Sequence, residues 1–359
     1  MMRDDRQPLQ FFDLIARQWQ APSVVSQVVF ANDSSAVAFV CDGAIAIAAT
    51  ADKSPPNARV RRAIDTAQLS IQPREGSYPG LRFADHPEGR TSALAPYGDA
   101  QFLFGKAAGR MNSMTPNGLC VHLPPKNSGP VAAVAESDGV VAYAIGTAVH
   151  LWHPERDPQQ VTAPAPVTAL RFAPDGQTLA IGHGMGVLVG SAQNPRAVLL
   201  DAAPVALEFS ADGHWLACPL ARGGLALIDL RDLACKVYDH FPGPVTSAGF
   251  GTKSVVASGA FRITAWGLDD GAPVITGKSG LVLIDAIAVD PKRNMVAVGY
   301  ANGLLSLSKI GSAAEVLLRQ DTGAGVSALN WSSCGRFLGV GGSDGSAALV
   351  EFPDEMFKS

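Results

Sequence analysis

The chain has 359 residues, of which 47% are hydrophobic and 17% charged, and its formal net charge is −4. This composition supports a large buried core and excludes general disorder. The net charge is slightly negative, and the chain lacks the excess of basic residues that binding to nucleic-acid phosphates requires. We therefore expect no nucleic-acid partner.

The cysteines and the ends of the chain limit the class of protein further. The cysteines are odd in number, and no pair has the spacing of zinc ligands: Cys41, Cys120, Cys218, Cys235 and Cys334. We therefore predict no structural disulfide, no bound metal, no cofactor and a reducing compartment. The N-terminus contains no signal-peptide core, and no apolar run reaches the roughly 20 residues of a membrane helix. We expect a cytoplasmic protein without membrane contact.

Taken in chain order, the first element is the segment DLIARQWQAP at residues 13–22. It has the length of a strand but belongs to no repeat, and helical periodicity is confined to FFDLIARQW around it.

Eight copies of one pattern follow, each with a short apolar strand, a polar turn, a second apolar strand, a glycine-rich turn and a third strand. The stretch PVTALRFAPDGQTLAIGHGMGVLV at residues 166–189 shows the pattern clearly. Its Pro-Asp-Gly turn and its glycine-rich turn have the chemistry of tight connections between antiparallel strands. The copies occupy residues 23–50, 92–123, 130–157, 166–192, 204–232, 244–270, 284–310 and 325–353.

The spacing of the copies indicates the architecture. One apolar anchor recurs at Phe30, Ala95, Ala135, Phe172, Phe209, Phe250, Val289 and Trp331. After a first interval of 65 residues, the intervals are 40, 37, 37, 41, 39 and 42. A period near 40 with strand-like content is typical of four-stranded propeller blades. We predict an all-β chain forming a single closed β-propeller of four-stranded antiparallel blades over residues 1–359.

Eight blades are preferred, but the copy that begins at Ser92 is weak, so seven blades plus an irregular segment is the alternative. Because the first interval exceeds the period, residues 51–91 are predicted to hold a fourth strand and an insertion. The Pro, Gly and charged residues of this insertion favour a surface loop.

The last copy supplies three strands, and PDEMFKS is too short and polar for a fourth. We predict that residues 13–22 form the outer strand of this blade, antiparallel to residues 346–352. This pairing would remove two exposed sheet edges. Arg17 and Gln18 are expected to border solvent there.

The copies resemble WD-repeat proteins over about residues 23–352. Small or apolar residues followed by glycine end the second strands, although the Trp-Asp dipeptide is replaced by pairs such as Trp152-His153, Ile228-Asp229 and Trp266-Gly267. The resemblance implies a rigid ring that presents loops to protein partners.

Other motifs have simpler interpretations. The stretch from Gly341 to Gly345 matches a nucleophile elbow, but a strand follows it where the elbow needs a helix. Residues 271–279, GAPVITGKS, have the wrong glycine spacing for a phosphate-binding loop. His150 and His153 point to opposite faces of a strand and cannot chelate one ion.

Basic residues in the insertion suggest a solvated surface, with a partner contact as the alternative. They are Arg59, Arg61, Arg62, Arg74, Arg82 and Arg90.

These observations predict a non-enzymatic, WD-repeat-like scaffold that binds one or more proteins. The alternative is a propeller enzyme or small-ligand binder with its site at the mouth of the central channel, built from titratable groups of several blades. For the scaffold, the candidate contact residues lie on turns between second and third strands, which should emerge on one face. They are His183, Met185, Arg222, Phe261, Asn302 and Asp344. An exposed aromatic such as Phe261 can be a binding hot spot.

Overall fold

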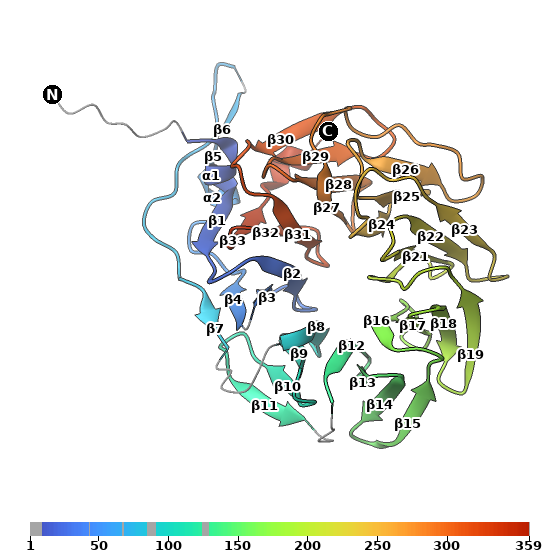
Figure 1. The fold of residues 1–359 in the computed structure, drawn as a ribbon. Helices are drawn as coiled ribbons and strands as arrows, with labels where there is room; N and C mark the ends of the chain where they lie inside the picture. Colours follow the sequence, from blue (N-terminus) through green and yellow to red (C-terminus); the bar gives the residue numbers. More distant parts are fainter. Residues whose placement is uncertain (1–8, 43, 67, 85–90, 124–128, 359) are drawn as a thin grey trace.

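The computed structural model describes residues 9–42, 44–66, 68–84, 91–123 and 129–358. Its strands form eight antiparallel blades that surround a central axis in chain order (Figure 1). The predicted eight-bladed β-propeller is therefore confirmed. The weak copy at Ser92 corresponds to a complete four-stranded blade, which excludes the seven-bladed alternative.

Each of the first four blades has four strands, from the axis outward. They are β2 (Val25–Phe30), β3 (Ala36–Cys41), β4 (Ala44–Ala49) and β7 (Arg82–Phe83) in blade 1; β8 (Thr91–Tyr97), β9 (Gln101–Lys106), β10 (Met111–Met114) and β11 (Cys120–Leu123) in blade 2; β12 (Val131–Ser137), β13 (Val140–Ile145), β14 (Ala148–His153) and β15 (Arg156–Thr162) in blade 3; and β16 (Val167–Phe172), β17 (Leu179–His183), β18 (Gly186–Ser191) and β19 (Asn194–Leu199) in blade 4.

The remaining blades follow the same order, except that blade 6 has three strands and a single bridge from Pro273 to Trp266 in place of the fourth. They are β20 (Glu208–Phe209), β21 (Trp215–Pro219), β22 (Leu225–Asp229) and β23 (Cys235–Tyr238) in blade 5; β24 (Ala248–Phe250), β25 (Ser254–Ala257) and β26 (Thr264–Gly267) in blade 6; β27 (Ile284–Val289), β28 (Met295–Tyr300), β29 (Leu305–Lys309) and β30 (Glu315–Arg319) in blade 7; and β31 (Val326–Trp331), β32 (Phe337–Gly342), β33 (Ser346–Glu351) and β1 (Ala16–Gln20) in blade 8.

The blades stack closely because small residues lie where one blade faces the next. Second-strand glycines contact first-strand valines of the following blade so closely that an added Cβ would overlap the valine side chain. The pairs are Gly105 with Val131, Gly299 with Val326, and Gly341 with Val25. Strands enclosed in this way are apolar on both faces, as β3 shows with all six residues buried. This packing explains the alanine- and glycine-rich second strands of the repeat.

The ring closes through the N-terminal strand, as predicted. Strand β1 pairs antiparallel with β33, and the register runs from Ala16 opposite Val350 to Gln20 opposite Ser346. The residues just before it form the short helix α1 (Phe11–Ile15) and not an extension of the strand. Phe12 and Ile15 of this helix are buried in the core of blades 7 and 8.

The prediction that Arg17 borders solvent is wrong. The residue is 3% exposed, and its guanidinium donates to the carbonyl oxygens of Thr50 at 2.7 Å and Ala51 at 3.1 Å. Its Nε also lies 3.9 Å from the carboxylate of Asp52. The physical reason is that the chain after β4 folds back over the closing strand and supplies these acceptors.

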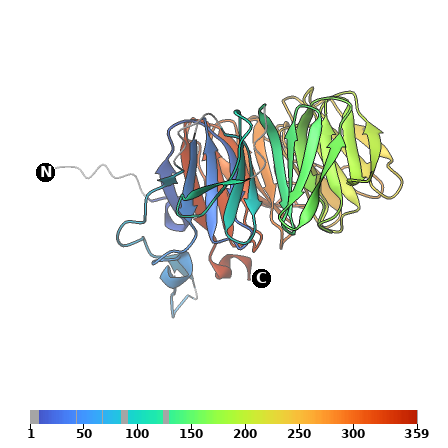
Figure 2. The ribbon, with the colours of Figure 1, turned by 90° about the horizontal axis from the view of Figure 1, so that it is seen from below.

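The insertion between β4 and β7 contains α2 (Pro56–Arg59) and a hairpin of β5 (Val60–Arg62) and β6 (Leu69–Ile71). In Figure 2 the hairpin projects from the same side of the disc as the C-terminal turn η1 (Asp354–Phe357). No helix among the described residues is long and apolar enough to cross a membrane.

The arginines of the insertion are only partly solvated, in contrast to the prediction. Arg59 is 6% exposed and donates to three carbonyl oxygens, including that of Leu14 at 2.6 Å. Arg74 forms a two-point ion pair with Asp52. Arg61 and Arg62 are exposed. Arg82 is exposed and donates to Asn117, and Arg90 lies outside the described residues.

Candidate interaction surfaces

Because each blade is an antiparallel meander, the turns between its second and third strands emerge on one side of the ring, here called the upper face. The lower face carries the turns between first and second strands, together with η1 and the β5–β6 hairpin. The six predicted contact residues lie on or beside upper-face turns, as expected from the repeat.

Three of the six have side chains that organise their own turns. His183 is 2% exposed, and its Nδ1 accepts the Met185 N–H at 3.2 Å. Burial lowers the pKa of His183, which favours the neutral imidazole that this bond requires. Asn302 accepts the Leu304 N–H, and Asp344 accepts the Ser346 N–H. His183 is therefore corrected from an accessible contact residue to a buried residue at the end of β17.

The other three present their side chains to solvent, as Asp344 also does. Met185 is 55% exposed and Phe261 is 44% exposed, while Arg222 is exposed on the turn that closes from Leu220 to Gly224. Beside Phe261 lies Leu281, which is 96% exposed and which sequence reasoning missed. A hydrogen bond of 3.1 Å from the Gly280 N–H to the Phe261 carbonyl oxygen joins the two loops.

The central channel has a volume of about 960 Å³ and is lined by first strands from blades all round the ring. Several of its hydroxyl groups connect neighbouring blades. Thr168 donates to the Pro204 carbonyl at 2.6 Å, and Thr246 donates to that of Asp285 at 2.6 Å. Outside the channel lining, Ser327 of β31 likewise donates to the Val25 carbonyl at 2.6 Å, across the ring closure. These hydrogen bonds link neighbouring blades of the ring.

The charged groups described along the channel are also largely paired. Arg171 binds Glu208 at 3.1 Å, and the fully buried carboxylate of Asp290 binds Arg293 at 2.7 Å. A catalytic site needs a nucleophile or acid aligned with a separate base. Neither pair has this form.

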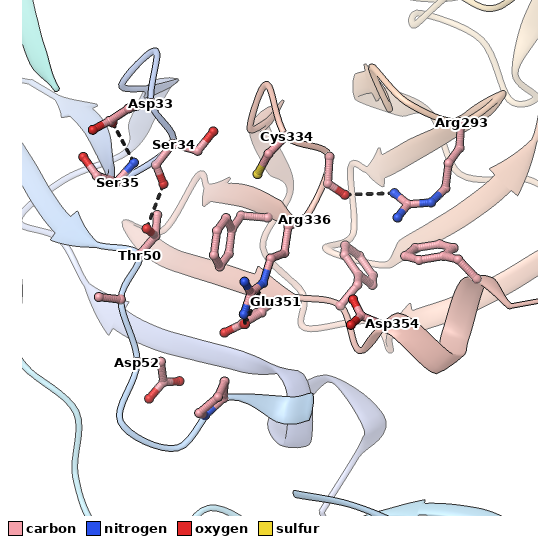
Figure 3. Close-up of a pocket in the computed structure, with 16 residues that line it drawn as sticks. Asp33, Ser34, Ser35, Thr50, Asp52, Arg293, Cys334, Arg336, Glu351 and Asp354 are labelled. Carbon is pink, nitrogen blue, oxygen red and sulfur yellow. Dashed lines mark hydrogen bonds and ion pairs between the residues drawn. The ribbon is translucent and has the colours of Figure 1, made fainter. Parts of the chain in front are cut away.

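A second cavity, of about 600 Å³, opens on the lower face where blades 7, 8 and 1 meet (Figure 3). Arg336 pairs with Glu351 in its centre, and Arg293 lies over the Phe357 ring at 3.7 Å. Cys334 lies in its wall, 3.3 Å from the Ser332 hydroxyl. Burial acts to raise the pKa of this thiol, but hydrogen bonds with the Ser332 and Ser34 hydroxyls and with the backbone at Cys334 and Arg336 together outweigh it, so the pKa is lowered.

The described part of the chain gives no positive indication of a metal site. There, no cluster of three or more His, Cys, Asp or Glu side chains is placed to hold an ion. His150 stacks on Tyr143 at 5.0 Å, and His153 accepts the Glu155 N–H. Both histidines thus have local structural contacts.

No family model and no curated protein matches the chain in sequence. Solved structures match in fold. The computationally designed Ika8 protein aligns with a TM-score of 0.68 and 20% identity, covering 93% of this chain and 98% of that one. The C-terminal WD40 domain of Sif2 aligns with a TM-score of 0.65 and 14% identity, covering 94% and 99%. A chain of the mitotic checkpoint complex aligns with a TM-score of 0.58 and 13% identity, covering 99% and 100%. Identities this low show a shared propeller fold, including WD40 domains, and nothing finer.

Proposed function

We propose that the chain is a non-enzymatic scaffold that binds one or more proteins through the upper face of blades 4 to 6. The observation that carries the proposal is the exposure of Met185 and Phe261 on turns whose counterparts in other blades are polar or glycine-rich, with exposed Leu281 on the adjoining β26–β27 connection. Large apolar side chains held at such positions are suited to fill pockets of a partner.

Two features support binding over catalysis. The hydroxyls that connect the blades fix the ring, so the upper-face turns are held on a rigid support with little ordering cost on binding. The channel charges are mostly paired, and the thiol of the lower cavity is hydrogen-bonded to serine hydroxyls and to the Arg336 backbone.

The fold neighbours agree with this proposal at the level of architecture. WD40 propellers are among them, and one aligned chain belongs to a complex by its printed title. A protein partner also fits the net charge of −4, which offers no general attraction for a phosphate backbone. We place the scaffold in the cytoplasm, as predicted from the sequence.

The test is quantitative affinity purification of the tagged chain from its native cell, comparing the wild type with Phe261→Ala. Loss of a hot-spot aromatic costs about 2 kcal/mol or more, so we expect partner recovery at limiting concentration to fall about 30-fold. Leu119→Ala is the matched control, because Leu119 is 66% exposed on a lower-face turn of blade 2. A partner recovered at fixed ratio and lost only with Phe261→Ala supports the proposal. Equal recovery with both variants, or no partner at fixed ratio, contradicts it.

A further inference from the structure

The outermost strand of a blade exposes backbone N–H and C=O groups that can pair with another chain. Blades 3 and 4 carry a proline in this strand, Pro158 in β15 and Pro195 in β19. Proline removes a donor and so discourages pairing at an edge. The outermost strand of blade 8, β1, has the sequence ARQWQ and contains no proline.

A segment of the insertion covers the edge of β1 instead. The Tyr78 hydroxyl accepts the Gln18 N–H and donates to the Gln18 carbonyl oxygen, both at 2.9 Å, and so occupies the two groups that a neighbouring strand would use. The Trp19 indole N–H donates to the Pro79 carbonyl oxygen at 2.9 Å, and the Trp19 and Tyr78 rings meet edge to face at 5.5 Å. Residues 76–81, here called the strap, therefore take the place of a fifth strand.

The strap is held to the blade mainly by Tyr78 and by Leu81, which packs against the core of blades 8 and 1. Ser77, Pro79 and Gly80 are exposed. Further anchors lie on either side of it, at the Arg74–Asp52 ion pair before it and at β7 after it. Because most of its residues are exposed and only Tyr78 and Leu81 are half-buried, the strap can lift away while the blade beneath stays folded.

The uncovered edge would be complementary to itself. Gln18 directs both backbone groups outward, and strand alternation gives the carbonyls of Ala16 and Gln20 the same direction. Two copies of β1 related by a two-fold axis at Gln18 would place Gln18 opposite Gln18 and Ala16 opposite Gln20. Such a contact is isologous and closed.

We propose that the strap masks the outer edge of β1, and that a second copy of the chain pairs with this edge, centred on Gln18, when the strap is displaced. The proposal does not depend on the upper-face scaffold function. It concerns a different surface, and its test uses the purified chain alone.

The experiment compares the full chain with Tyr78→Ala, which removes the hydroxyl and the ring that hold the strap. Sedimentation velocity over a range of concentrations should show a dimer for this variant where the wild type is monomeric. In dilute solution, hydrogen exchange at the Gln18 amide should accelerate about tenfold, because its hydrogen bond is lost. Ile64→Ala is the control, since Ile64 is fully exposed in the same insertion, between β5 and β6 and outside the strap.

A second variant separates edge pairing from nonspecific association. Gln18→Pro removes the N–H that a second copy needs, and this N–H bonds to Tyr78 and not to β33. The double variant Gln18→Pro/Tyr78→Ala should therefore return to a monomer. The proposal is overturned if Tyr78→Ala stays monomeric at every concentration, whatever its exchange rate, or if its dimer persists in the double variant.

Discussion

Replacing Phe12 with alanine should destabilise the whole ring, because this side chain fastens the N-terminal segment to the last two blades. Phe12 is 1% exposed within the core cluster of blades 7 and 8, and its ring lies 5.3 Å from the guanidinium carbon of Arg319. Truncating a fully buried phenylalanine removes its apolar burial and leaves a cavity, which together cost about 3–5 kcal/mol.

The neighbouring residue provides a matched control. Phe11 belongs to the same helix but is 36% exposed, so Phe11→Ala should change the free energy of unfolding by less than about 1 kcal/mol. Urea unfolding followed by far-UV circular dichroism measures both variants on one scale. Equal midpoints for Phe12→Ala and Phe11→Ala would refute the claim that the N-terminal segment is part of the core.

Three further predictions concern acid stability, thiols and proteolysis. Burial acts to raise the pKa of Asp52, but hydrogen bonds from Arg74 and the Ser54 backbone, together with the charges of Arg74 and Arg17, outweigh it, so the pKa is lowered. The charge of Asp52 therefore stabilises the fold above about pH 4 and ceases to do so as pH falls through the folded-state pKa. Asp52→Asn should be less stable than the wild type at pH 7, and the difference in urea midpoint should shrink below about pH 4; a constant difference would be inconsistent with this role. In the folded protein a thiol reagent should label Cys334 well before Cys218, because Cys334 is exposed with a lowered pKa, whereas burial raises the pKa of Cys218. Mass spectrometry that showed the reverse order of labelling would contradict the structure. Limited proteolysis should cut first within residues 51–91, and an early cut in blade 5 that releases two stable halves would show that the ring is not a single domain.

The architecture could be predicted because each blade is built from local hairpins. Short-range sequence patterns are enough to show the repeat of about 40 residues and the tight turns, which indicated eight blades. The same patterns show that the last copy has three strands and that one strand-length segment precedes the first copy, which indicated closure by β1. Even the weak copy at Ser92 kept its apolar second strand, with Phe102, Leu103 and Phe104 fully buried.

The errors arose where distant segments meet. Arg17 was expected in solvent because an outer strand normally borders water, yet the chain 33 and 34 residues later folds over it. His183 lies on the predicted turn, but strand alternation does not determine whether a residue at a strand end faces the next blade or the solvent. No short sequence pattern predicts the lower-face cavity, because its walls come from residues as far apart in the chain as Asp33 and Asp354.

The most direct test of the closed ring is disulfide trapping between β1 and β33. Gln18 and Ala348 lie opposite each other in the register of β1 and β33. Because the N–H and C=O groups of Gln18 point away from β33, the two residues form a non-hydrogen-bonded antiparallel pair. The Cα atoms of such a pair are close enough for a disulfide. The account predicts that Gln18→Cys/Ala348→Cys forms an intramolecular disulfide under mild oxidation, found by peptide mass spectrometry, and that the shifted pair Gln18→Cys/Ser346→Cys forms far less. Preferential cross-linking of the shifted pair, or no cross-link in either variant, would contradict closure of the propeller through its N-terminal strand.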